Sequence, residues 1–130
     1  MGFLPHKSDN GAVLPWEYMA AKAGTYTVGQ MLNVDINGNL AAITANLTTT
    51  PKYLCMAQGT FAEGDILPVT RVSEDWIYET VMNTGFVNTP IVGSKASVLA
   101  GGLAVNNDVA GTFEFTAIGV GSNPVWGRFV

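Results

Sequence analysis

Apolar and polar residues alternate one by one between residues 32 and 37, and this alternation restricts the local structure more than any other feature of the chain. Three aliphatic side chains occupy every second position, with Asn or Asp between them. A period of two places the apolar side chains on one face of a strand. Asn37 and Gly38 follow, and both residue types tolerate the positive φ of a two-residue hairpin turn. The sequence therefore predicts a β-hairpin whose second strand lies at residues 40–43.

Short runs of the same kind continue to the end of the chain, separated by Gly, Pro, Asn and Asp. No pattern with a helical period extends beyond ten residues, although residues 15–23 have some helix propensity. Pro68 interrupts one run, which predicts a sheet edge or a bulge there. Short strands with frequent turns predict an all-β fold, a small single-domain barrel or sandwich of short antiparallel strands. The further strands are predicted at residues 53–57, 66–72, 76–81, 95–100, 103–105, 113–118 and 125–130.

The first 23 residues differ in character from the rest. Pro5 and Pro15 exclude a long helix, yet the segment is rich in apolar and aromatic side chains. We therefore predict an extended N-terminal arm over residues 1–23, ahead of a β domain over residues 24–130 that folds without it. Such an arm needs a groove, either on its own domain or on a neighbouring subunit. The candidate contact residues are Phe3, Leu4, Val13, Leu14, Trp16 and Tyr18.

The chain has unusually little charge. Charged residues make up 12% of it, against about 25% in an average soluble domain. Neutral surface of this kind is expected to be buried against a partner, although a β protein that simply uses few charges remains an alternative. The six Lys and Arg residues are scattered, which disfavours direct binding of nucleic acid. No apolar stretch reaches the roughly 18 residues that would cross a membrane.

Candidates for catalysis or metal binding are few. The single histidine, His6, lies in the arm, and the single cysteine, Cys55, lies in an apolar run. An arm is a poor support for a catalytic base, and one His with one Cys falls short of a zinc site. The lone cysteine also excludes an internal disulfide and indicates synthesis in a reducing cytoplasm. We expect no catalytic site, cofactor or metal.

Other polar or aromatic motifs have simpler explanations than chemistry. Glu63 with Asp65, and Glu74 with Asp75, fall in predicted turns, where carboxylates are usually solvated. The three tryptophans would form a carbohydrate-binding platform only if two or three were exposed on one face. Packing in the core or at an interface is the commoner fate of tryptophan.

Several short segments in the middle of the chain occur in a familiar order. They are residues 15–18 (PWEY), 24–32 (GTYTVGQML), 38–40 (GNL), 51–56 (PKYLCM), 66–72 (ILPVTRV) and 75–80 (DWIYET). This series resembles the small head-decoration, or cement, proteins of tailed bacteriophages. The resemblance covers roughly residues 15–82. The Gly-rich C-terminal part is similar only in its general composition, and residues 126–130 depart from the family.

The resemblance implies a β-rich protein bound outside the capsid shell. Its expected partner is the major capsid protein, and it would oppose the pressure of packaged DNA by bridging capsomers. Many such proteins are homotrimers. The chain would then be made in the cytoplasm of the bacterial host and carried on the outer capsid surface of the virion. The alternatives are another phage structural component, such as a head fibre base or a tail protein, and a carbohydrate-binding β module.

Overall fold

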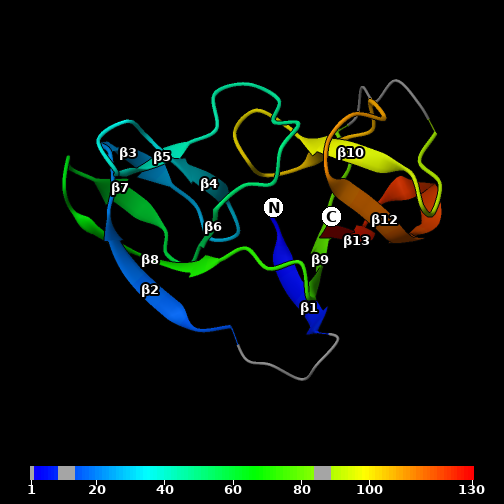
Figure 1. The fold of residues 1–130 in the computed structure, drawn as a ribbon, viewed down its shortest axis with the longest axis horizontal. Helices are drawn as coiled ribbons and strands as arrows, with labels where there is room; N and C mark the ends of the chain where they lie inside the picture. The colour runs from blue at the N-terminus through cyan, green and yellow to red at the C-terminus, as the bar shows by residue number, and fades with distance from the viewer. Residues whose placement is uncertain (1, 9–13, 84–88) are drawn as a thin grey trace.

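A computed structural model describes residues 2–8, 14–83 and 89–130. The strands form two larger antiparallel sheets and one small two-stranded sheet (Figure 1). None of the sheets closes into a barrel among the described residues. The predicted all-β fold of short antiparallel strands is confirmed, and of the two predicted architectures it agrees with a small sandwich. Within the described part, no helix has both the length and the apolar composition to cross a bilayer.

The six-stranded sheet lies on the right in Figure 1. Its strands, in spatial order, are β1 (Leu4–Ser8), β9 (Trp76–Thr80), β13 (Val125–Phe129), β12 (Phe113–Ile118), β10 (Lys95–Val98) and β11 (Val105–Asn106). Alternate residues along β12 and β13 are buried, as the period of two requires. A short 3₁₀ turn, η1 (Val120–Ser122), joins these two strands.

The five-stranded sheet lies on the left in Figure 1. Its strands, in spatial order, are β2 (Trp16–Ala20), β8 (Ile66–Arg71), β6 (Tyr53–Cys55), β4 (Met31–Val34) and β5 (Leu40–Ala42). The small sheet pairs β3 (Gly24–Tyr26) with β7 (Gly59–Phe61).

Two hydrophobic clusters hold the sheets together. The first joins the two larger sheets, since it combines Met31 and Leu54 with the aromatic side chains of the six-stranded sheet. The second lies between the five-stranded sheet and the small sheet, where Tyr26 packs edge-on against Phe61. The members of the first cluster are Phe3, Met31, Ile43, Leu54, Tyr78, Met82, Ala96, Val98, Val105, Phe113, Phe115, Val125 and Phe129.

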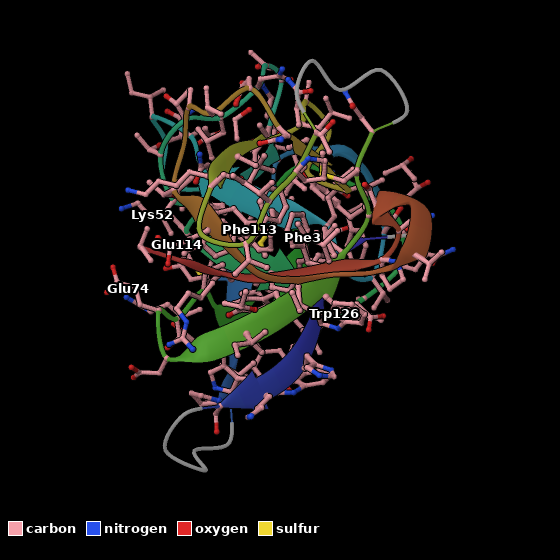
Figure 2. All side chains as sticks on the ribbon, turned by 90° about the vertical axis from the view of Figure 1, so that its right-hand side faces the viewer. Phe3, Lys52, Glu74, Phe113, Glu114 and Trp126 are labelled. Atoms are coloured by element: carbon pink, nitrogen blue, oxygen red, sulfur yellow. The ribbon has the colours of Figure 1, made fainter. Side chains whose placement is uncertain are left out.

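The N-terminal segment is part of both sheets. β1 pairs with β9 and β2 pairs with β8, so both strands of this segment are paired within their own chain. The side chain of Phe3 is completely buried in the first cluster (Figure 2). The independent folding of residues 24–130 stays a prediction. The helix propensity of residues 15–23 is overridden, because strand pairing satisfies the backbone there.

The hairpin at Asn37-Gly38 exists, but its turn is longer than predicted. Val34 pairs with Leu40, and the Asp35 amide donates to the Asn39 carbonyl (2.8 Å), which leaves a three-residue loop. Only Gly38 has a positive φ, of 84°. The Asp35 side chain determines the longer turn, because its Oδ1 accepts hydrogen bonds from two loop amides.

Candidate interaction surface

The two larger sheets differ in how their outer strands are covered. β5 is bridged on its outer side by Ala21, which pairs with Leu40. β11 is bridged in the same way by Met82, which pairs with Val105. Among the described residues, no bridge is found on the outer side of β1 or of residues 16–19 of β2. Both open edges are therefore in the N-terminal segment.

The β1 edge carries the features that protect natural edge strands. The register with β9 shifts between Pro5 and Lys7, so His6 is an extra residue in a β-bulge. Pro5 has no amide proton to donate, and Lys7 adds an exposed charge. Bulges, prolines and lysines all hinder pairing with a further strand. The β1 edge is thus unsuited to a partner strand.

The β2 edge has none of these protections. All five residues pair with β8 in regular register, and none of them is proline or lysine. Two aromatic side chains of this strand are exposed, Trp16 to 52% and Tyr18 to 68%. A regular edge with exposed aromatic residues is a surface on which a partner can pack.

The backbone groups of Trp16 and Tyr18 point toward this open side. Tyr18 lies opposite Pro68, whose carbonyl faces β6 and accepts a hydrogen bond from the Met56 amide (3.0 Å). In an antiparallel sheet, the backbone N–H and C=O of one residue point to the same neighbouring strand. Residue pairs that lie opposite each other alternate along the two strands: one pair exchanges hydrogen bonds, and in the next pair both residues point their groups away from each other. Tyr18, opposite a residue whose groups face away, therefore directs its own N–H and C=O outward. Trp16, two residues earlier, does the same.

The side chains beside this edge form an apolar patch. Opposite residues of paired strands share a face, so Tyr18 lies beside Pro68, and Trp16 projects from the same face. Ile66, the β8 residue opposite Ala20, is 57% exposed on that face. We call Trp16, Tyr18, Ile66 and Pro68 the β2 patch. It has no charged member, so covering it requires no desolvation of an ion.

The side chains on the opposite face of β2 contact the rest of the protein. The Glu17 carboxylate accepts two hydrogen bonds from Arg71, both of 3.2 Å, and the Arg71 guanidinium lies 5.5 Å from the centre of the Tyr53 ring. Met19 packs against the second cluster. These contacts hold β2 in place while its aromatic face is open to solvent.

The structure separates the predicted contact residues. Phe3 is in the core, Leu4 is 43% exposed on β1, and Leu14 is half-buried before β2. Val13 lies outside the described residues. Only Trp16 and Tyr18 come together on one surface. Sequence reasoning missed Ile66 and Pro68, because residues 66–69 are apolar on both faces and the alternation gives no signal there.

The candidate catalytic residues lie in different parts of the fold. Cys55 is completely buried in the second cluster, and burial raises the pKa of its thiol. His6 lies on the outer side of the six-stranded sheet, with its ring centre 6.1 Å from that of Trp126. The two residues thus belong to different sheets.

Of the predicted turn carboxylates, Glu63 links its turn to two other segments and Asp65 caps its own turn. Glu63 accepts hydrogen bonds from the Ala23 amide and the Asn39 side chain, both at 3.0 Å. Asp65 accepts one from the Ala62 amide (2.8 Å). No group of three His, Cys, Asp or Glu residues able to hold a metal ion is found in the described part of the chain.

The three tryptophans do not share a face. Trp16 belongs to the β2 patch, whereas Trp76 is half-buried against the first cluster. Trp126 lies on the outer side of the six-stranded sheet (Figure 2). A platform made of several tryptophans, one of the alternatives considered from the sequence, is therefore not formed.

No protein-family model, curated protein or solved structure matches this chain.

Proposed function

We propose that this chain is a structural protein of a bacteriophage particle, which binds the outer surface of the capsid and stabilises it by bridging capsomers. The observation that supports the proposal most is the β2 patch beside an open strand edge. The resemblance of residues 15–82 to head-decoration proteins supplies the identity of the partner, the major capsid protein. The chain is made in the cytoplasm of the bacterial host and acts on the virion without catalysing a reaction.

The chemistry of the β2 patch suits a permanent contact. Tyr and Trp are enriched at the centres of protein interfaces, where they contribute more binding energy than other residues. The patch also has no charge to desolvate, and the neighbouring Glu17 already has Arg71 as its partner. A partner that covers Trp16 and Tyr18 therefore removes apolar area from water at little electrostatic cost.

Repetition over a capsid makes a modest contact sufficient. A decoration protein occupies many equivalent sites, and a subunit that contacts two capsomers or a sister subunit gains from effective concentration. A self-associated form, which the resemblance suggests is a homotrimer, would present several β2 patches at once. The proposal thus needs no single contact of very high affinity.

Co-sedimentation with the DNA-free heads of the phage that encodes the chain tests the proposal. The full-length protein is mixed with heads, the heads are pelleted, and the bound fraction is measured at several concentrations. Trp16→Ala with Tyr18→Ala is expected to weaken binding by about 1,000-fold, since each truncation at an aromatic contact costs about 2 kcal/mol.

A matched pair of aliphatic substitutions separates the patch from general surface effects. Ile66→Ala removes an exposed side chain inside the β2 patch, and Ile36→Ala removes one that is 100% exposed in the β4–β5 loop. We expect only Ile66→Ala to weaken sedimentation with heads. Equal binding by all variants, or binding to purified tails and not to heads, would contradict the proposal. The second result would favour a tail component.

A further inference from the structure

The outer side of the six-stranded sheet carries a hollow of about 300 Å³, on a different sheet from the β2 patch. Four adjacent strands, β1, β9, β13 and β12, contribute its lining. Its lining combines apolar and polar side chains, and Trp126, labelled in Figure 2, is its one aromatic residue apart from the imidazole of His6. The lining residues are His6, Lys7, Ile77, Thr116, Ala117 and Trp126.

Both register irregularities among the described strand pairs occur at this hollow. The β1–β9 register shifts at His6, and the β12–β13 register shifts at Thr116. Every other described pair of strands is regular. A β-bulge redirects a side chain, and bulges are over-represented next to functional sites. Here two bulges on different strands each place a polar residue, His6 or Thr116, in the lining of the same hollow.

The tryptophan is held in a defined orientation. Its indole Nε1 donates a hydrogen bond of 3.0 Å to Oε1 of Glu79 on the neighbouring strand β9. The imidazole of His6 lies 6.1 Å from the Trp126 ring, with 51° between the two planes. A bound ligand would meet an indole ring that is already fixed, so little conformational entropy would be lost on binding.

The mixture of polar groups indicates a neutral, hydroxylated ligand. Within the lining, Lys7 donates hydrogen bonds and the Thr116 hydroxyl both donates and accepts, while Glu79 is an acceptor beside the hollow that holds the Trp126 indole. The lining carries one lysine, Lys7, which disfavours a cation, and the Glu79 carboxylate beside the hollow disfavours an anion. Hydroxyl groups can satisfy both kinds of partner, and a pyranose ring has an apolar face of C–H groups that stacks on an indole. A proline-rich peptide is less suitable, because it docks in a groove lined by several aromatic side chains.

We propose that this hollow binds a neutral pyranose sugar of a glycan, stacked on Trp126 and hydrogen-bonded by Thr116, His6 and Lys7. The volume, at the lower end of ligand pockets, suits a single ring. The proposal does not depend on capsid binding, since it concerns a different sheet. It would give a particle-bound protein a weak affinity for surfaces that display sugars.

Nuclear magnetic resonance on the full-length chain tests the site. The indole Nε1–H signal of Trp126 is assigned by its loss in Trp126→Phe. Short neutral oligosaccharides of glucose, mannose, galactose and N-acetylglucosamine are then titrated separately, with an acidic oligosaccharide and a polyproline peptide as comparators. We expect at least one neutral sugar to shift the Trp126 signal with a dissociation constant on the order of 1 mM, and the Trp16 signal to stay unchanged.

Variants show whether the shift reports binding in the hollow. Thr116→Val keeps the shape of the side chain and removes its hydroxyl, and it should weaken sugar binding by about 10-fold. Trp16→Ala, outside the hollow, should leave sugar binding unchanged. No shift with any neutral sugar would overturn the proposal. A shift with the acidic sugar or the polyproline peptide alone would also overturn it, because the hollow would then take another class of ligand.

Discussion

The ring of Phe3 packs edge-on against the ring of Phe113, with 5.8 Å between their centres. The Phe3 amide also donates a hydrogen bond of 2.7 Å to the Gly29 carbonyl, just before β4. The start of the chain thus joins the aromatic core of one sheet to the backbone that leads into the other. A segment expected to lie in a groove of its own domain or of a neighbour thus packs, at Phe3, into its own fold, while Trp16 and Tyr18 of β2 stay exposed.

Removing the Phe3 side chain should therefore destabilise the protein strongly. We expect Phe3→Ala to lower the free energy of unfolding by about 3–5 kcal/mol, the usual cost of deleting a buried phenylalanine. Leu4→Ala, at an exposed position, should cost less than about 1 kcal/mol. Urea unfolding followed by tryptophan fluorescence measures both values. Equal, small losses would show that Phe3 does not belong to the core.

The length of the β4–β5 turn can be tested by comparing two neighbouring residues. Gly38 has a φ of 84° and nothing near its missing Cβ, so Gly38→Ala should cost about 1–2 kcal/mol through backbone conformation alone. Asn37 is not among the residues with positive φ, so Asn37→Ala should have a much smaller effect. Thermal unfolding measures both variants. A two-residue turn would instead make the two substitutions similarly costly.

Stability should fall in alkaline solution. Burial raises the pKa of the Cys55 thiol and of the Tyr78 hydroxyl, so the folded state retains protons that the unfolded state has lost. This contribution is fully present below the unfolded pKa values and is lost as the pH rises through the folded ones. Urea midpoints should therefore decline above about pH 8.5, where an unfolded thiol begins to ionise, and further above about pH 10.

A variant isolates the tyrosine part of this dependence. Tyr78→Phe keeps the ring and removes the ionisable hydroxyl, so its stability should decline less steeply above about pH 10 than that of the native chain. A native urea midpoint that stays constant up to pH 11, or rises, would contradict the burial of both groups.

Self-association is a separate expectation. If the proposed homotrimer exists in solution, native mass spectrometry should give three times the chain mass of 13.7 kDa. A trimer that persists in Trp16→Ala with Tyr18→Ala would leave the β2 patch free for the capsid. A trimer that dissociates in this variant would instead show that the β2 patch contacts a sister subunit.

The strands that follow local alternation could be predicted from the sequence. Side chains alternate between buried and less buried along residues 113–116 and 125–129, and the strands Phe113–Ile118 and Val125–Phe129 lie close to the predicted limits. The β4–β5 hairpin was predicted for the same reason. Its turn length was not, because the hydrogen bonds of Asp35 depend on side-chain geometry and not on residue type alone.

The candidate site was only partly predictable. Trp16 and Tyr18 were chosen for their aromatic character, and they are exposed together. Phe3 was chosen for the same reason and is buried, since composition does not distinguish a core residue from an interface residue. The outward direction of the β2 backbone depends on the pairing of Tyr18 with Pro68, which lies about 50 residues away along the chain. The register between strands that are far apart in the sequence cannot be predicted from the local alternation of apolar and polar residues.

Electron cryo-microscopy of the intact phage particle tests the central claim most directly. The account predicts density for this two-sheet fold on the outside of the head, with the open edge of β2 and the side chains of Trp16 and Tyr18 against a capsomer. Density for the chain in the tail would contradict it. So would a capsid-bound chain whose β2 edge faces solvent while another surface makes the contact.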